Sequence, residues 1–188
     1  MKFKKPLFWN SKNIISIILY PLSLIVLIIN ELKELNSKKK FLIKTICVGN
    51  TYLGGTGKTS LAIEIQNLLK NKFKTVFIKK NYINQLDEIS LLKTKGDLIS
   101  KNSREEALNL ASKKKYELAI LDDGLQQKNI NYNLKIICFN AEDGFGNNYL
   151  LPAGPLRESV NKIKNYDIAF INGEKKNDNL YLKLKSIN

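Results

Sequence analysis

A glycine-rich segment between an apolar run and an amphipathic run constrains this chain more than any other feature. Residues 49–59 read GNTYLGGTGKT; they follow the apolar run Phe41–Val48 and precede Thr59–Leu69, whose apolar residues share one helical face. Glycines let backbone N–H groups turn inward around an anion, and the following helix N-terminus adds partial positive charge. The strict pattern G-x-x-x-x-G-K-[ST] is not met, because its first glycine would fall at Tyr52. The remaining GGTGKT at a strand-to-helix junction still predicts a phosphate-binding loop.

The end of this loop carries two side chains suited to a nucleotide. We expect Lys58 to reach the β- and γ-phosphates of ATP and the Thr59 hydroxyl to hold Mg²⁺. A glycine-rich turn that binds nothing is the alternative, and the strand and helix on either side count against it. The residues predicted to bind the nucleotide are Tyr52, Leu53, Gly54, Gly55, Thr56, Gly57, Lys58 and Thr59.

Beyond the loop, apolar strand-like runs alternate with helical stretches. A second helix is expected to begin at Ser103, which would form an S-x-x-E capping box with Glu106. This alternation predicts an α/β fold of the P-loop NTPase type, with a doubly wound, mainly parallel sheet preceded by an N-terminal hydrophobic helix. Short, continuous apolar runs fit strands that are covered on both faces. The predicted strands are Phe41–Val48, Thr75–Ile78, Leu118–Leu121, Ile136–Phe139 and Ile168–Ile171.

Acidic residues follow two of these strands. Asp122 and Asp123 come directly after LAIL, and a carboxylate at the carboxyl end of a core strand is where a P-loop enzyme holds Mg²⁺. Asp-Asp-Gly is also good turn chemistry, which is the alternative. Asp87, beside Glu88, could act as a general base toward a substrate hydroxyl, or it could be a solvated loop acid. Arg157, in the turn-rich segment LPAGPLRE, suits a phosphate contact.

The N-terminal region is strongly apolar. Residues Ile14–Ile29 carry no charge, but this run of 16 residues is shorter than the roughly 20 that span a bilayer comfortably. Three interpretations remain: an interfacial or shallowly inserted anchor, which we favour, a single span, and a buried core helix. Pro21 would kink a helix here. Trp9 and Tyr20 could lie at the level of the lipid headgroups.

The composition limits the kinds of molecule that this chain is expected to bind. Lys plus Arg number 31 against 17 Asp plus Glu, so the formal net charge is +14. Such a charge favours anionic partners. The alternative is that biased codon usage, which would also explain the many Lys, Asn and Ile residues, is the source of the charge. The lysine runs are too short for a nucleic-acid arm, and the lack of histidine excludes His-based metal sites and general bases. Cys47 and Cys138 lie in apolar runs and are expected to be buried.

The ordered set of motifs resembles the tetraacyldisaccharide 4'-kinase family, the lipid A 4'-kinases. It comprises a hydrophobic N-terminal helix followed by VGNTYLGGTGKTS at 48–60, LDEISLL at 86–92, LDDGLQQ at 121–127 and FGNNYLLPAGPLRES at 145–159. The resemblance covers nearly the whole chain. It implies transfer of the ATP γ-phosphate, with Mg²⁺, to the 4'-hydroxyl of a tetraacyldisaccharide 1-phosphate. It places this reaction at the cytoplasmic face of the bacterial inner membrane.

The resemblance also implies roles for individual residues. Asp87 would activate the hydroxyl, and Lys58 with Thr59 would bind the phosphates and Mg²⁺. The remaining assignments are Asp122 and Asp123 to the metal, Arg157 and Glu158 to catalysis, and Asn50 and Gln126 to the substrate. The expected division is an N-terminal membrane-associated helix at 1–36 and a kinase domain at 37–188. Family members carry a second, smaller domain beyond this, which a partner chain could complete.

Two other functions stay open at the level of sequence. One is a membrane-associated P-loop ATPase switch, against which the leucine at position 53 counts, because such proteins often carry a second lysine at the start of the loop. The other is a non-catalytic, nucleotide-binding remnant, motivated by the absence of histidine and of the second domain.

Overall fold

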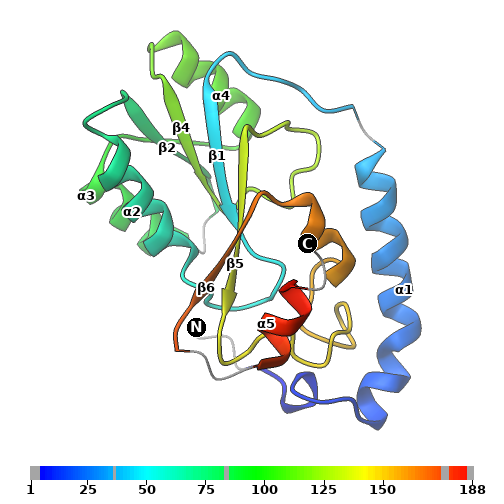
Figure 1. The fold of residues 1–188 in the computed structure, drawn as a ribbon. Coiled ribbons are helices and arrows are strands. Elements are labelled where there is room, and N and C mark those ends of the chain that lie inside the picture. The colour runs from blue at the N-terminus through cyan, green and yellow to red at the C-terminus, as the bar shows by residue number, and fades with distance from the viewer. Residues whose placement is uncertain (1–4, 36, 83–84, 175–177, 186–188) are drawn as a thin grey trace. The chain divides into compact units, whose positions relative to one another are not determined.

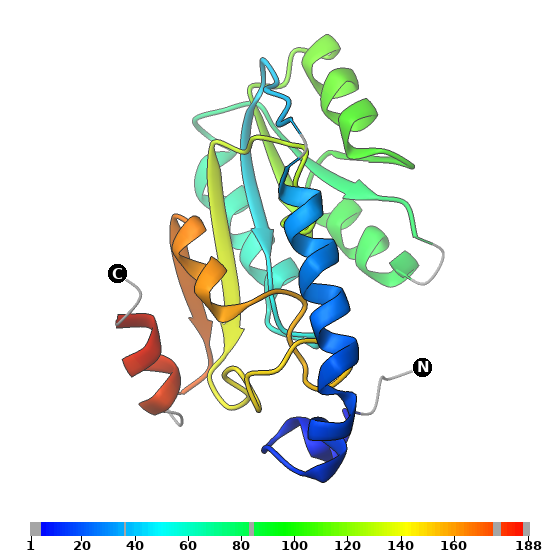
Figure 2. The ribbon, with the colours of Figure 1, turned by 90° about the vertical axis from the view of Figure 1, so that its right-hand side faces the viewer.

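The computed structural model describes residues 5–35, 37–82, 85–174 and 178–185. Figures 1 and 2 show strands interleaved with helices along the chain, as predicted. The helices are α1 (Ile14–Glu34), α2 (Lys58–Leu69), α3 (Leu86–Lys95), α4 (Arg104–Lys113) and α5 (Asp178–Lys185), with 3-10 turns η1 (Leu7–Trp9) and η3 (Val160–Asn165). The strands are β1 (Lys44–Gly49), β2 (Thr75–Lys80), β3 (Leu98–Lys101), β4 (Leu118–Asp122), β5 (Leu134–Asn140) and β6 (Ile168–Asn172).

The strands form one six-stranded sheet in the order β3-β2-β4-β1-β5-β6. Strand β1 pairs with β4, β4 with β2, and β2 with β3, all in parallel. Strand β4 lies between β2 and β1, which are not its neighbours in sequence, so crossovers connect these strands, as in a doubly wound sheet. The predicted α/β fold is therefore confirmed, and β3, α3 and α5 are additional elements that the sequence patterns did not indicate.

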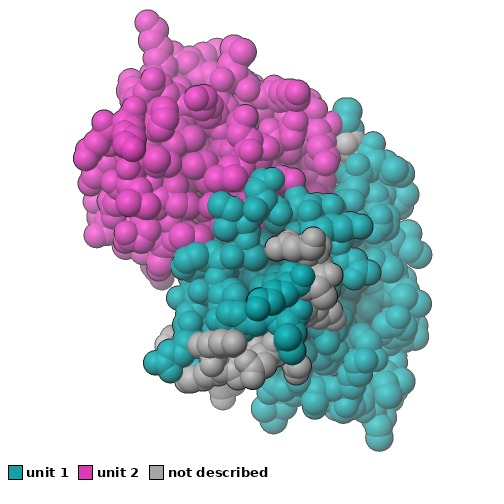
Figure 3. Space-filling model, in the orientation of Figure 1, with its two compact units in different colours: residues 1–37, 50–57, 137–188 teal, residues 38–49, 58–136 magenta. Residues whose placement is uncertain are grey.

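The chain divides into two compact units, which Figure 3 colours separately. Unit 1 comprises residues 1–37, 50–57 and 137–188, and unit 2 comprises 38–49 and 58–136. The predicted division into 1–36 and 37–188 stays a prediction.

Unit 2 contains β1 to β4 with α2, α3 and α4. Helix α2 packs on β1 and β4, and α4 packs on β2 and β3. The apolar run of β2 is completely covered, as is the run of β4, so both match the prediction of strands buried on two faces. Helix α4 is capped by Ser103, whose hydroxyl accepts from the N–H of Glu105 at 3.2 Å. The helix start is thus where the sequence predicted it, with the cap bonded one residue earlier than in a capping box.

Helix α1 of unit 1 reverses the usual pattern of an amphipathic helix, because its buried side is polar and its exposed side is apolar. Its buried residues are Ser16 and Ser23, whereas Ile18 and Ile25 are 70% and 54% exposed. The alternative of a buried core helix is therefore wrong. Among the described residues α1 alone has the length and apolar composition to cross a membrane, with a mean hydropathy of 2.2. The helix continues through Pro21 to Glu34.

The expected headgroup position of Trp9 is also wrong. The indole is 4% exposed, and its Nε1 donates to the carbonyl of Pro152 at 3.1 Å, so its polar edge finds a partner inside unit 1. Tyr20 is 43% exposed and contacts Tyr149, with the ring centroids 5.1 Å apart.

Candidate functional site

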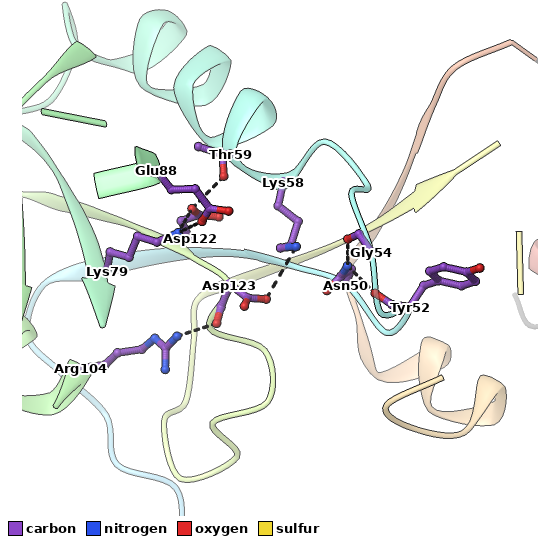
Figure 4. A network of polar contacts seen from close by, with 10 residues as sticks. All are labelled: Asn50, Tyr52, Gly54, Lys58, Thr59, Lys79, Glu88, Arg104, Asp122 and Asp123. Atoms are coloured by element: carbon purple, nitrogen blue, oxygen red, sulfur yellow. Dashed lines mark hydrogen bonds and ion pairs between the residues drawn. The ribbon is translucent and has the colours of Figure 1, made fainter. Parts of the chain in front are cut away.

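The loop that joins β1 to α2 is shaped by a buried side chain and by a glycine in the left-handed region. The side chain of Asn50 is fully buried and donates to the carbonyls of Tyr52 at 2.6 Å and Gly54 at 3.2 Å (Figure 4). Gly57 has a φ of 82°, and a Cβ there would lie 2.7 Å from Nδ2 of Asn172. This position therefore requires glycine, and α2 begins at the next residue. In this structure Asn50 shapes the loop from within.

The first half of the loop is held by the LPAGPLRE segment of the same unit. Leu53 donates its N–H to the carbonyl of Pro155 at 2.9 Å, and Arg157 donates its N–H to Thr51 at 2.7 Å. Between these bonds Tyr52 and Leu156 form an antiparallel bridge. Two motifs about a hundred residues apart in sequence are thereby joined through their backbones.

In unit 2 the first turn of α2 meets the carboxyl end of β4. The hydroxyl of Thr59 donates to Oδ2 of Asp122 at 3.0 Å, and Asp122 is fully buried (Figure 4). The parallel register pairs Val48 with Asp122, so the carboxylate lies level with the end of β1, where the loop begins. The fold therefore brings together Thr59 and Asp122, both of which the sequence analysis assigned to Mg²⁺, and that metal role stays a prediction.

A buried lysine that the sequence analysis did not single out completes this cluster. The ammonium of Lys79, at the end of β2, lies 2.5 Å from Oδ2 of Asp122 and also pairs with Glu88 on α3. Burial alone would lower the pKa of Lys79, but the charges and hydrogen bonds of Asp122 and Glu88 outweigh burial and raise it. Lys79 is therefore held in its charged form at the carboxyl ends of the strands.

Arg104, a second residue that the sequence analysis did not single out, orients Asp123. Its φ of 60° places it in the left-handed region, and its carbonyl accepts from Nη2 of Arg104 at 2.6 Å. Arg104 is 6% exposed and also donates to Oε1 of Gln127 at 3.2 Å. The Asp123 carboxylate lies 4.0 Å from Nζ of Lys58. The only sequence signal for Arg104 was its place just after the helix cap Ser103.

The other predicted site residues are placed as follows. Asp87 lies in the first turn of α3 and not in a loop, but it is solvent-exposed, as the alternative expected, and its catalytic role stays a prediction. Gln126 is exposed in the turn after β4. In unit 1, Glu158 is 4% exposed and accepts from the hydroxyl of Tyr166, beside the half-buried Arg157. No contact between the described side chains joins Asp87 to Lys58, Thr59 or Asp122.

The residues at the end of β4 fit a magnesium ion. Oδ1 of Asp122 is buried and accepts no hydrogen bond from the part of the chain that the structure describes. Hard oxygen donors such as this carboxylate and the Thr59 hydroxyl are the ligands that Mg²⁺ prefers. The described residues contain no cluster of three acidic, histidine or cysteine side chains.

The sequence and the fold are similar to those of known proteins. The family model for tetraacyldisaccharide-1-P 4'-kinase matches residues 15–97 and 85–187. The tetraacyldisaccharide 4'-kinase of Pelagibacter ubique is 51% identical over 92% of this chain and 56% of its own length. That of Rickettsia bellii is 32% identical over 92% of this chain and 60% of its own length.

A solved structure agrees with these matches. The LpxK of Aquifex aeolicus in complex with ATP superposes with a TM-score of 0.73 and 25% identity, covering 84% of this chain and 59% of that one. The chain thus spans a little over half the length of the relatives it matches. The ordered motifs, the sheet and the family match agree, and the chain belongs to the tetraacyldisaccharide-1-P 4'-kinase family.

Proposed function

We propose that this chain supplies the nucleotide-binding part of an ATP-dependent kinase that phosphorylates the 4'-hydroxyl of a tetraacyldisaccharide 1-phosphate in lipid A biosynthesis. The observation that carries the proposal is the bond from Thr59 to the buried Asp122 at the start of α2. It is supported by the family and by the ATP complex of the Aquifex aeolicus relative.

The nucleotide would bind on residues 52–59. Backbone N–H groups of the loop and the N-terminus of α2 would surround the phosphates, and Lys58 would add a mobile positive charge. Thr59, Asp122 and Asp123 would hold Mg²⁺, which neutralises phosphate charge when bound. Lys79 pairs with Asp122 through Oδ2, which leaves Oδ1 available to the metal.

The acceptor would be activated by Asp87. It lies exposed in the first turn of α3, where a substrate hydroxyl can reach it. Arg157 and Glu158 would line the site and Gln126 would face the substrate, whereas the buried Asn50 would hold the shape of the loop. In this scheme positioning and charge stabilisation supply most of the rate enhancement.

The acyl chains of such a substrate call for a lipid surface. The exposed isoleucines and leucines of α1 would lie in the bilayer interface, at the cytoplasmic face of the inner membrane where ATP is present. The N-terminal helix at 1–36 would thus serve the kinase domain at 37–188.

A label-transfer assay tests this function. The full chain in detergent is incubated with γ-labelled ATP, Mg²⁺ and the disaccharide lipid, with and without the polypeptide that would complete the family length. Label in the lipid that is lost in the Lys58→Met variant supports the proposal. Binding of ATP without transfer in either mixture would instead indicate a nucleotide-binding remnant, and ATP hydrolysis without transfer would indicate an ATPase switch.

A further inference from the structure

The buried side of α1 carries polar residues at a fixed spacing. Ser16, Ser23 and Asn30 are seven residues apart, which places them along one face of a helix. Ser16 and Ser23 are 0% and 2% exposed, and Asn30 is half-buried, whereas the isoleucines on the other faces are exposed. A polar seam on the inner side of so apolar a helix needs partners, because buried hydroxyl and amide groups left unpaired are costly.

Two members of the seam bind the backbone of the segment 150–157. Ser23 donates its hydroxyl to the carbonyl of Leu150 at 2.7 Å and accepts from the N–H of Ala153 at 3.2 Å. Asn30 donates its side-chain amide to the carbonyl of Arg157 at 2.7 Å. Helix α1 therefore holds this segment at both ends. Ser16 instead closes the capping box with Asn13 and takes no part in this grip.

The same segment holds the nucleotide loop on its other side. Arg157 donates its N–H to Thr51 while its carbonyl faces Asn30, so one residue bridges loop and helix. The bond from Leu53 to Pro155 lies two residues away, and Tyr52 and Leu156 between them are each 1% exposed. These contacts all lie within unit 1 and form one continuous chain from α1 to the loop.

We propose that Ser23 and Asn30 are positioning residues for the nucleotide loop, acting through the backbone of residues 150–157. The inference rests on the proposed function in taking a nucleotide as the ligand. A loop whose amides must converge on phosphates binds more tightly when its backbone is fixed beforehand. Residues 50–57 have no helix or ladder of their own, so the bridge to 155–157 and its support from α1 provide that fixation. On this account α1 does more than anchor the chain.

Matched serine variants of the full chain in detergent test the proposal. Hydrogen exchange at the amides of Leu53 and Arg157 is measured first, without nucleotide, in wild type, Ser23→Ala, Asn30→Asp and Ser16→Ala. Affinity for a fluorescent ATP analogue with Mg²⁺ is measured next, alongside thermal unfolding. Ser23→Ala and Asn30→Asp should speed exchange at both amides and weaken nucleotide binding about tenfold, the loss expected when one buried hydrogen bond is broken. Ser16→Ala should lower thermal stability without either effect.

Ser23→Thr separates positioning from general damage, because it keeps the hydroxyl and should restore both readouts. Unchanged exchange in Ser23→Ala and Asn30→Asp would overturn the inference, whatever the nucleotide does. Faster exchange with unchanged affinity would overturn the positioning role. A wild-type chain that binds no nucleotide would refute the proposed function and with it the ligand assigned here, and the exchange data would still decide whether α1 fixes the loop.

Discussion

The ammonium of Lys79 lies 2.5 Å from Oδ2 of Asp122, and the two side chains are 1% and 0% exposed. They come from neighbouring parallel strands, β2 and β4, and meet at the carboxyl edge of the sheet. The same carboxylate oxygen accepts from Thr59 at 3.0 Å. One buried oxygen therefore joins the helix after the loop to two strands, and its charge is balanced inside the protein.

Removing the positive charge of Lys79 should destabilise the fold. Lys79→Met would leave the Asp122 carboxylate buried without its counter-charge, so we expect the free energy of unfolding to fall by about 3–5 kcal/mol. Urea unfolding in detergent solution measures this. Lys80→Met, one residue along on the same strand, should change stability by less than about 0.5 kcal/mol. Equal effects of the two variants would show that the buried pair contributes nothing special.

The hydroxyl of Thr59 should matter for Mg²⁺-dependent binding. Thr59→Val keeps the shape of the side chain but removes the oxygen that contacts Asp122. We expect ATP affinity in the presence of Mg²⁺ to fall about tenfold or more, as for loss of a hydrogen bond to a charged group, with little change when EDTA is present. Thr94→Val, on the exposed side of α3, is the matched control. A Thr59→Val variant that retains the full Mg²⁺ effect would remove Thr59 from the metal site.

Two glycines of the loop should respond differently to the same substitution. Gly57 has a φ of 82°, and a Cβ there would lie 2.7 Å from Nδ2 of Asn172. Gly57→Ala should therefore destabilise the fold by about 1–3 kcal/mol through backbone strain. A Cβ on Gly55 would meet no atom within 4 Å, so Gly55→Ala should be nearly neutral. Thermal unfolding of both variants checks this, and the reverse order would show that the loop conformation differs from the one described.

How far the sequence predicts the fold depends on how local each signal is. The run LAIL and the helix after Lys58 were predicted because strand burial and an apolar stripe are visible within a few residues. Strand β1 begins at Lys44 instead of Phe41, since Leu42 is completely exposed. Helix α3 was missed because it buries only Ile89 and Leu92, which is too narrow a stripe to recognise.

Within the candidate site, too, some residues could be predicted from local sequence signals and others could not. Thr59 and Asp122 could be predicted because a P-loop ends in a helix and a carboxylate follows a core strand, and parallel pairing brings the two together. Lys79 and Arg104 could not, because their burial depends on partners that are distant in sequence. The prediction for Trp9 was wrong for the same reason, because its hydrogen-bond partner Pro152 lies in a different motif.

Stability should depend on pH through the buried thiol of Cys47. Burial raises the pKa of Cys47 to about 12 from its ordinary value of 9.0, against the opposing charge of Arg104. In this range the unfolded chain loses the thiol proton and the folded chain keeps it, so stability is full below pH 9 and falls as pH rises toward 12. The thiol contributes a fall of up to about 1.4 kcal/mol per pH unit.

Cys47→Ala removes the titrating thiol and leaves the other titrating groups in place. Its free energy of unfolding should therefore fall less steeply than that of wild type between pH 9 and 12, as measured by urea unfolding at a series of pH values. Parallel curves for the two proteins would mean that the thiol titrates in the folded state at its ordinary pKa.

The exposed apolar face of α1 should determine binding to lipid. Ile18 and Ile25 are 70% and 54% exposed, and each isoleucine that enters a bilayer interface gains roughly 1.5–3 kcal/mol. Ile18→Lys and Ile25→Lys should each lower the partition coefficient onto vesicles containing anionic lipid by about tenfold or more, as measured by flotation. Leu68→Lys is the matched control, because Leu68 is 74% exposed but lies on α2. If all three variants partition equally, the apolar face of α1 does not meet the membrane and its exposure must serve another contact. If only the α1 variants lose binding, the helix meets lipid on its isoleucine face while its polar seam faces the segment 150–157.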